Sequence, residues 1–132
     1  MVNENFTLLV VDDGEENRDI LSRRLKAAGF KTETAKDGQQ AMDVLHEKVI
    51  HLVLLDIMMP EVDGITLLSQ IRADSTFDDM PVIMVTAIDV VNVAQDCLRK
   101  GACAYVTKPY DMDVIKQKIR LCLKLEPRLV SG

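Results

Sequence analysis

The sequence predicts an α/β protein, in which a mostly parallel sheet is covered by helices on both faces. Apolar runs without alternation, as at residues 7–11 and 52–55, are typical of strands that are buried on both sides. Stretches with a helical apolar stripe separate these runs at short spacing, which favours parallel strands joined by right-handed crossovers. With 48% hydrophobic and 28% charged side chains, the 132 residues fit one globular domain.

The first predicted strand covers residues 7–11, and the acidic pair Asp12 and Asp13 follows it directly. A helix should come next, with Gly29 as its stop, because glycine readily adopts the left-handed conformation found after helix ends. The face that this helix is expected to bury consists of Ile20, Leu21, Leu25 and Ala28.

The short, alternating stretch 31–35 is typical of an edge strand, and a capped helix follows it. Asp37 is predicted to cap this helix, with Gln40 in the capping-box position. We expect His46 on its solvent side and a structural role for His51, which has no second His or Cys at metal-ligand spacing. The expected buried face is formed by Ala41, Val44 and Leu45.

The third predicted strand, 52–55, ends at Asp56, a carboxylate directly after a fully apolar run. Pro60 has no N–H to donate to a strand neighbour and predicts that the strand ends before it. Asp56 is therefore expected at the carboxyl edge of the sheet, where open α/β sheets bind their ligands. The stripe that predicts the following helix consists of Gly64, Leu67, Leu68 and Ile71.

Two further strands are predicted at 81–85 and 104–107, and a polar residue follows each: Thr86 and Lys108. A helix over 90–102 is expected between them. Its expected buried face consists of Val90, Ala94, Cys97, Leu98 and Ala102, with Gly101 near its end.

The last helix is predicted from Met112 to about Leu125, and it is more apolar than one buried stripe requires. The residues expected in its core-facing stripe are Met112, Ile115, Ile119, Cys122 and Leu123. The additional apolar residues, expected on a surface that binds a partner, are Val114, Leu121 and Leu125.

Composition excludes several classes of function. A net charge of −5 argues against the basic face of a protein that binds nucleic acid directly. No apolar run approaches the roughly 18 residues of a membrane span, and the start lacks the order of a signal peptide, so we expect a cytoplasmic protein without membrane contact. Residues 1–126 are expected to form the domain, and 127–132 a tail or truncated linker.

Three cysteines, Cys97, Cys103 and Cys122, have no C-x-x-C spacing. Their odd number and their spacing make a disulfide framework or a zinc site improbable. We expect all three to behave as small buried hydrophobic residues.

The strand order 2-1-3-4-5 of the flavodoxin-like doubly wound fold would bring the strand-end acids Asp12, Asp13 and Asp56 into one pocket. Singly, these acids are more often turn caps, Thr86 can end a strand by propensity, and Lys108 can be a surface lysine. Together, three close carboxylates would repel by a few kcal/mol per pair and therefore call for a cation. Oxygen ligands without His or Cys favour Mg²⁺.

Such a pocket suits a phosphoryl group. The metal and an ammonium neutralise its oxygens, a hydroxyl donates to one of them, and a carboxylate can attack phosphorus in line. In the order and spacing of these residues, and in the Asp63-Gly64 and Lys108-Pro109 pairs, the chain resembles the receiver domain of two-component response regulators. The resemblance covers nearly its whole length.

The resemblance implies that Asp56 is the phosphoacceptor and that Mg²⁺, for which Mn²⁺ can substitute, is held by Asp12, Asp13, Asp56 and the backbone carbonyl of Met58. Lys108 would contact the phosphoryl group. Thr86 and Tyr105 would be the switch residues, and the bond before Pro109 would be cis, as is usual in the family.

The same resemblance implies a signalling domain that phosphorylates itself rather than an enzyme. Its partners would be a sensor histidine kinase or a phosphotransfer protein, with a homodimer or output partner on the fourth helix, fifth strand and fifth helix. Met58 and Ile88 occupy positions that influence hydrolysis in the family, and neither side chain can orient water, so slow self-dephosphorylation is expected.

Two alternatives remain open from the sequence. A phosphohydrolase of the haloacid dehalogenase type also uses an Asp nucleophile with Mg²⁺, but it carries a second Asp two residues later, where this chain has Met58. The other alternative is an interaction module that is independent of phosphorylation and whose acids are structural.

Overall fold

The computed structural model describes residues 2–59 and 62–125. Its strands are β1 (Thr7–Val11), β2 (Lys31–Ala35), β3 (Leu52–Leu55), β4 (Val82–Thr86) and β5 (Ala104–Thr107). They form one parallel sheet in the order β2-β1-β3-β4-β5, which confirms the predicted order. Pro60, which predicted the end of the third strand, and the predicted tail lie outside the described residues.

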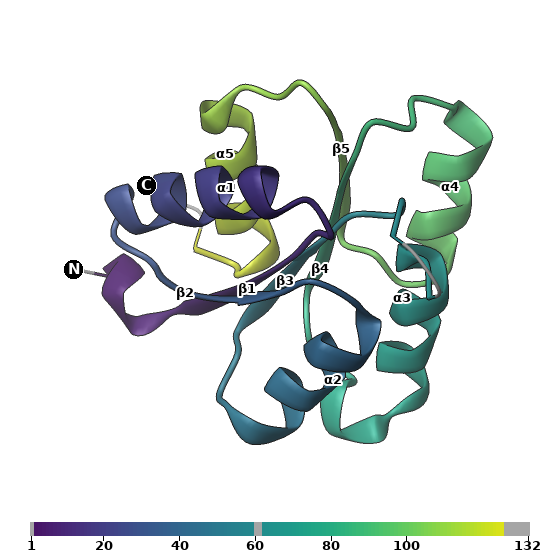
Figure 1. Ribbon diagram of the computed structural model, residues 1–132, viewed down its shortest axis with the longest axis horizontal. Helices are drawn as coiled ribbons and strands as arrows, with labels where there is room; N and C mark the ends of the chain where they lie inside the picture. The colour runs from purple at the N-terminus through teal and green to yellow at the C-terminus, as the bar shows by residue number, and fades with distance from the viewer. Residues whose placement is uncertain (1, 60–61, 126–132) are drawn as a thin grey trace, which may run out of the picture.

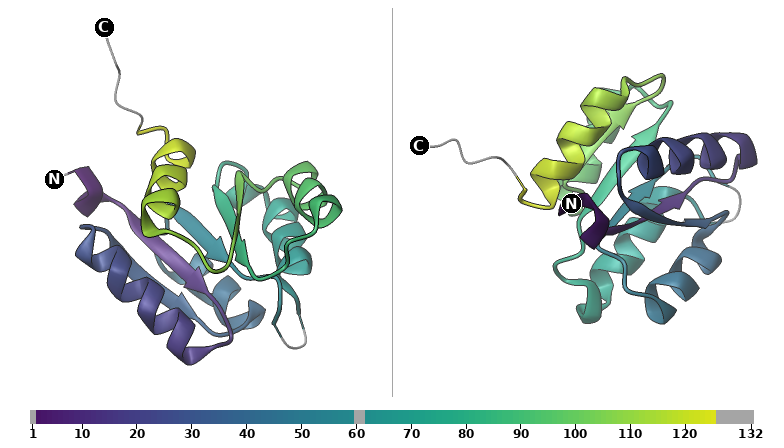
Figure 2. Two further views of the ribbon diagram at one scale, coloured as in Figure 1. Left: turned by 90° about the horizontal axis from the view of Figure 1, so that it is seen from above. Right: turned by 90° about the vertical axis from the view of Figure 1, so that its left-hand side faces the viewer.

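Helices cover both faces of the sheet. They are α1 (Glu15–Ala27), α2 (Gly38–Glu47), α3 (Gly64–Ala73), α4 (Val91–Arg99) and α5 (Met112–Cys122), with short 3₁₀ turns η1 (Val2–Asn5) and η2 (Ser75–Phe77). α1 and α5 lie on one face, and α2, α3 and α4 lie on the other (Figures 1 and 2). None of the helices in residues 2–59 and 62–125 has the length and apolar character needed to cross a membrane.

Each face of the sheet has its own apolar core. In β1, Leu8 and Val10 pack with α1 and α5, whereas the alternate residues Leu9 and Val11 pack with α2 and α3. All four side chains are at most 1% exposed. The two cores explain why the central strands are apolar at every position, since neither face meets water.

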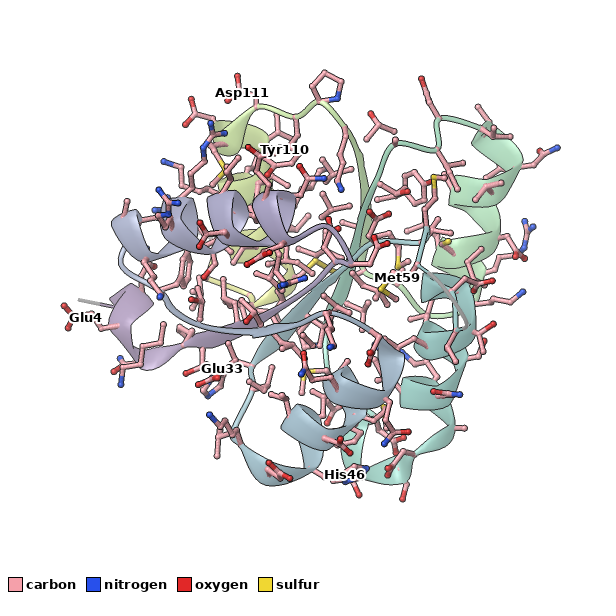
Figure 3. All side chains as sticks on the ribbon, in the orientation of Figure 1. Glu4, Glu33, His46, Met59, Tyr110 and Asp111 are labelled. Atoms are coloured by element: carbon pink, nitrogen blue, oxygen red, sulfur yellow. A yellow bond between two sulfur atoms is a disulfide. The ribbon has the colours of Figure 1, made fainter. Side chains whose placement is uncertain are left out.

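Side-chain caps start three of the helices as local sequence favours. Asp37 Oδ1 accepts a hydrogen bond from the Gln40 N–H at 2.8 Å, which confirms the predicted cap of α2. Asp63 caps α3 and Asp111 caps α5 in the same way. His46 lies on the outside of α2, as expected (Figure 3).

His51 has the expected structural role. Its Nδ1 accepts a hydrogen bond at 3.0 Å from the backbone N–H of Thr7, at the start of β1. The bond ties the entry of β3 to the beginning of its neighbour.

The prediction for the fourth helix is wrong in two respects: where the helix ends and which of its residues are buried. α4 stops at Arg99, and Gly101 has a φ of +109°, a left-handed conformation that ends the helix before Ala102. Val90 and Leu98 are 51% and 46% exposed, and only Cys97 is fully buried within α4. In α1, Ile20 is likewise more exposed than expected, at 37%.

A disulfide joins Cys103 to Cys122, contrary to the expectation that all three cysteines are unpaired. Cys103 directly precedes β5 and Cys122 is the last residue of α5, so the pair forms only because the helix returns along the strand that precedes it. Spacing along the chain carries no signal of this contact. Cys97 is free and fully buried, as expected.

Candidate functional site

Asp12 and Asp56 meet at the carboxyl edge of the sheet because β1 and β3 are neighbours. Val11 pairs with Leu55 in the sheet register, so the acid that follows each strand lies beside the other. The Lys108 ammonium bridges them, donating to Asp12 Oδ2 at 2.8 Å and to Asp56 Oδ2 at 3.0 Å. The structure therefore brings together three of the residues that the sequence singles out.

Backbone donors hold the second oxygen of each carboxylate. Gly14 N–H donates to Asp12 Oδ1 at 2.9 Å, and Met58 N–H donates to Asp56 Oδ1 at 3.1 Å. The two side chains are only 10% and 9% exposed. Both carboxylates are thus fixed in orientation, with Asp56 Oδ2 facing the ammonium of Lys108.

Lys108 is held in place by its own backbone. Its N–H donates to the carbonyl of Thr86 at 2.8 Å, which ties the end of β5 to the end of β4. Burial alone would lower the pKa of the Lys108 ammonium, but hydrogen bonds and charge from Asp12 and Asp56 outweigh it, and the pKa is raised. Lys108 therefore stays charged and neutralises part of the acidic pocket. The bond before Pro109 is cis, as the resemblance implied.

The acidic pocket contains two converging carboxylates rather than three. Asp13 is exposed, and no three His, Cys, Asp or Glu side chains in the described chain are grouped to hold a metal ion. The donor chemistry still fits a hard divalent cation, because Asp12 and Asp56 offer only carboxylate oxygens and no nitrogen or sulfur. Met58 is 59% exposed beside them.

Thr86 and Tyr105 both bind Ile88, in the loop after β4. Ile88 N–H donates to Thr86 Oγ1 at 3.4 Å, and the Tyr105 hydroxyl donates to the Ile88 carbonyl at 2.7 Å. Thr86 is fully buried and Tyr105 is half-buried. The two predicted switch residues are therefore linked through the backbone of a single residue of this loop, Ile88.

Gly64 supports Asp56 in a way that sequence reasoning missed, because Gly64 was expected in a turn, in a buried helical stripe and in a family motif, but not in contact with Asp56. Its N–H donates to the Ile57 carbonyl at 2.9 Å. A Cβ at this position would lie 2.1 Å from the Asp56 carbonyl oxygen and 2.7 Å from Ile57 Cα. The sequence signal that could have indicated this close approach is a glycine directly after the helix cap Asp63.

Two surrounding features complete the site. Arg18 Nη1 donates to the Asp12 carbonyl at 2.8 Å, so α1 holds the turn that carries the acidic pair. Beside Lys108, a cavity of about 190 Å³ is lined by residues that include Asn17, Ile20 and Tyr110. Tyr110 and Asp111 stand where the chain passes from β5 into α5 (Figure 3).

Comparison with known proteins identifies the family. The family model of the response regulator receiver domain matches residues 8–120. The chain is 39% identical, over 117 residues and 89% of its length, to a probable transcriptional regulator, ycf27, of Guillardia theta, of which it spans 45%. It is 40% identical over 119 residues, 90% of its length, to the sensor histidine kinase RcsC of Escherichia coli, of which it spans 12%.

The chain spans 12% to 53% of the length of these and similar curated relatives. Among solved structures, it is similar to a Francisella response regulator receiver domain, with a TM-score of 0.84 and 28% identity over 92% of this chain and 98% of that one. It is also similar to the Vibrio cholerae chemotaxis protein CheY4, with a TM-score of 0.83 and 25% identity over 89% and 98%. The chain belongs to the receiver domain family of two-component response regulators.

Proposed function

We propose that Asp56 is the phosphoacceptor of this receiver and that residues 1–126 form the phosphorylated domain. The observation that carries the proposal is the Lys108 bridge, which joins Asp56 to Asp12 at the edge of the sheet. Asp56 is 7% exposed and is held by the Met58 N–H, so one carboxylate oxygen is pre-oriented for in-line attack.

The proposed reaction moves one phosphoryl group. Asp56 Oδ2 attacks phosphorus as the bond between phosphorus and the donor nitrogen or oxygen breaks, and the donor leaves with its electron pair. Lys108 shifts from the carboxylate to a phosphoryl oxygen and neutralises part of its charge. The hydroxyl of Thr86 leaves the Ile88 N–H and donates to another phosphoryl oxygen.

We infer that Asp12, Asp13, Asp56 and the Met58 carbonyl hold Mg²⁺, with Mn²⁺ able to substitute. The bound ion supplies positive charge that offsets the phosphoryl oxygens. Asp12 and Asp56 already lie together at the site, and Asp13 is the exposed neighbour of Asp12. Asp13 would join Asp12, Asp56 and the Met58 carbonyl as a ligand of the ion.

The proposed switch runs through Ile88. When Thr86 moves toward the phosphoryl group, it releases the Ile88 N–H, and the loop that the Tyr105 hydroxyl contacts can rearrange. A ligand shifts an equilibrium only by the contacts it gains in one state, and the Thr86 hydrogen bond is such a contact. Tyr105 would then occupy the space that Thr86 vacates, changing the face of α4, β5 and α5.

We further propose that the domain acts in the cytoplasm, without direct contact to nucleic acid or membrane. A sensor histidine kinase or a phosphotransfer protein would donate the phosphoryl group. Val114 and Leu121, 40% and 50% exposed on α5, would contribute to a homodimer or output surface. Because Met58 and Ile88 cannot orient water, the domain would hydrolyse its own acyl phosphate slowly, without being an enzyme for other substrates.

Incubation with acetyl phosphate and Mg²⁺, followed by intact mass, tests the proposal. The wild type should gain one phosphoryl group, and Asp56→Asn should gain none. Asp63→Asn is a matched control, because Asp63 is an exposed acid nearby that caps α3 and should leave labelling unchanged. A phosphohydrolase would consume acetyl phosphate in many turnovers without a lasting adduct, and a pure interaction module would show neither adduct nor turnover.

A further inference from the structure

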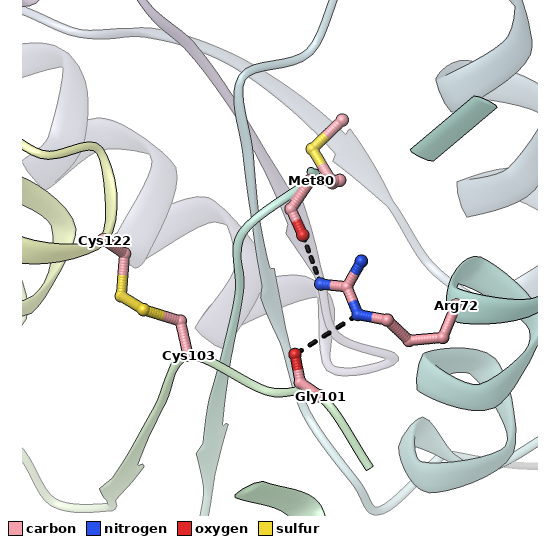
Figure 4. The surroundings of a disulfide bond; sticks show 5 residues. All are labelled: Arg72, Met80, Gly101, Cys103 and Cys122. Atoms are coloured by element: carbon pink, nitrogen blue, oxygen red, sulfur yellow. Dashed lines mark hydrogen bonds between the residues drawn. A yellow bond between two sulfur atoms is a disulfide. The ribbon is translucent and has the colours of Figure 1, made fainter. Parts of the chain in front are cut away.

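The disulfide between Cys103 and Cys122 connects two elements that lie side by side (Figure 4). Cys103 stands at the amino end of β5, and Lys108 follows the carboxyl end of the same strand. The bridge is therefore at the opposite end of the sheet from Asp56, and its chemistry is separate from that of the acidic pocket.

The two cysteines differ in access. Cys103 is exposed, whereas Cys122 is only 7% exposed and packs in the core between α5 and the sheet. A thiol in solution can therefore reach the bridge from the Cys103 side. Cys97 is fully buried, and burial raises the pKa of its thiol, so it remains a poor nucleophile.

Contacts other than the bridge hold Cys103 in place. Its N–H donates to the Val82 carbonyl at 2.7 Å. Two residues earlier, the Gly101 carbonyl accepts from Arg72 Nε at 3.2 Å, and the same guanidinium donates to the Met80 carbonyl (Figure 4). It also donates to the Phe77 carbonyl at 2.9 Å. The turn before β5 is thus tied to α3 and to the segment before β4 from the side away from α5.

The end of α5 is also closed independently of the bridge. Leu125 N–H donates to the Arg120 carbonyl at 2.7 Å and Lys124 N–H to the Leu121 carbonyl at 3.1 Å, the hydrogen-bond pattern of a Schellman motif. Because both segments are fixed by other contacts, the reduced cysteines would remain near their Cα separation of 6.1 Å. The disulfide can therefore form again without a rearrangement of the backbone.

We propose that Cys103 and Cys122 form a reversible redox site, which exchanges with small thiols of the glutathione type and is entered at Cys103. In reduction, a glutathione thiolate attacks Cys103 Sγ, the disulfide breaks, and Cys122 leaves as a thiolate that takes a proton. A second glutathione thiolate attacks the glutathione sulfur of the mixed disulfide and releases Cys103. Two electrons pass from two glutathione molecules to the pair, and glutathione disulfide is the product.

Opening the bridge releases a constraint on the unfolded chain over 19 residues of sequence separation, while the contacts described above keep the folded arrangement. On the chain-entropy scale for a loop of this size, the melting temperature should fall by about 10 °C. The redox state of the pair would thereby set the thermal stability of the domain.

The test equilibrates the complete 132-residue chain in buffers with different ratios of reduced to oxidised glutathione, approached from both directions. Acid quenching, alkylation and intact mass then count the free thiols. The proposal expects a reversible change of two thiols across these ratios, with the melting temperature following the reduced fraction. A bridge that stays closed in the most reducing buffer, or never forms in the most oxidising one, would overturn it.

Single variants test the point of entry. Cys122→Ala should accumulate a glutathione adduct on exposed Cys103, whereas Cys103→Ser should leave Cys122 largely unmodified. Cys97→Ala is the matched control and should titrate like the wild type. The reverse adduct pattern in folded variants, checked by circular dichroism, would contradict entry at Cys103, as would faster alkylation of Cys122 than of Cys103 in the reduced wild type.

Discussion

Gly64 packs against the backbone carbonyl of Asp56 so closely that an added Cβ would lie 2.1 Å from its oxygen. This contact places the start of α3 directly behind the turn that carries the candidate phosphoacceptor. The position of Asp56 therefore depends on a missing side chain as well as on the residues that bind its carboxylate.

Replacing Gly64 with alanine should displace the backbone of Asp56 and Ile57. The added Cβ would meet the Asp56 carbonyl and Ile57 Cα, which are backbone atoms and cannot rotate away as a side chain could. We expect a loss of about 3 kcal/mol in the free energy of unfolding, together with loss of labelling by acetyl phosphate. Urea unfolding and intact mass measure the two effects. Gly38→Ala is the control, since the nearest neighbours of its Cβ would be side-chain atoms, of Val62 at 3.2 Å and of Leu67 at 3.8 Å, and it should cost less than about 1 kcal/mol. Equal losses in the two variants would refute the steric argument.

Lys108→Met should destabilise the metal-free protein by about 1–2 kcal/mol at pH 7, since Asp12 and Asp56 lose their shared cation while remaining buried. Lys100→Met is the control. Lys100 pairs with Asp96 on the surface, where both side chains are 41% exposed, and the change should cost no more than about 0.5 kcal/mol.

The Lys108 effect should depend on pH with a definite sign. The folded-state pKa lies above the ordinary lysine value of 10.5, so the contribution of the ammonium is fully present below pH 10.5. It is lost as pH rises through the folded pKa. The difference in unfolding free energy between wild type and Lys108→Met should therefore stay constant between pH 7 and 9 and shrink above pH 10.5. A difference that grows at alkaline pH would contradict the bridge.

Asp13→Asn should slightly stabilise the metal-free fold, because it removes a negative charge next to Asp12. Since Asp13 is exposed, the gain should be no more than about 0.5 kcal/mol. Mg²⁺ should raise the unfolding free energy of the wild type, and this increment should vanish in the variant. Unfolding with and without Mg²⁺ measures both effects, and a destabilised metal-free variant or a retained Mg²⁺ increment would count against the ligand role of Asp13.

Met58→Asn should shorten the lifetime of the acyl phosphate. Met58 is 59% exposed beside Asp56, and an amide in its place can bind and orient an attacking water, which a thioether cannot. Decay of the intact-mass adduct after removal of acetyl phosphate measures the rate. An unchanged or longer lifetime in the variant would show that this side chain does not protect the bond.

Leu121→Asp should weaken self-association or binding of a partner without unfolding the domain, because Leu121 is 50% exposed on α5. Light scattering with and without an acyl phosphate mimic reports the oligomeric state. Arg120→Gln is the matched control, because Arg120 is exposed on a different side of the same helix and the change lowers the net charge by the same amount. A wild type that remains monomeric in both states, combined with unchanged partner binding by Leu121→Asp, would remove the proposed surface.

The sequence predicted the sheet well because its strands are buried on both faces. Runs such as residues 7–11 and 52–55 are apolar throughout, and this pattern identifies central parallel strands and the acids at their ends. The meeting of Asp12 with Asp56 then follows from strand order. Local caps, such as Asp37, were also predictable, because they depend on residues only three positions apart.

Features that depend on tertiary contact were not predictable. The Cys103–Cys122 bridge needs α5 to return along β5, and the contact of Gly64 with Asp56 depends on how α3 packs after its cap. Surface exposure of Val90 and Leu98 also escaped prediction, because an apolar stripe on a helix does not reveal whether another element covers it. Asp13 is an acid at the same edge, yet it is exposed, whereas Asp12 and Asp56 are buried.

The most direct test of the central claim is to locate the phosphoryl group. The wild type is labelled with acetyl phosphate and Mg²⁺, the acyl phosphate is converted to a stable derivative, and the fragments are sequenced by mass spectrometry. The derivative should be found on Asp56, with none on Asp12, Asp13 or Asp63. A derivative on one of those acids, or none anywhere in a folded protein that binds Mg²⁺, would contradict the account.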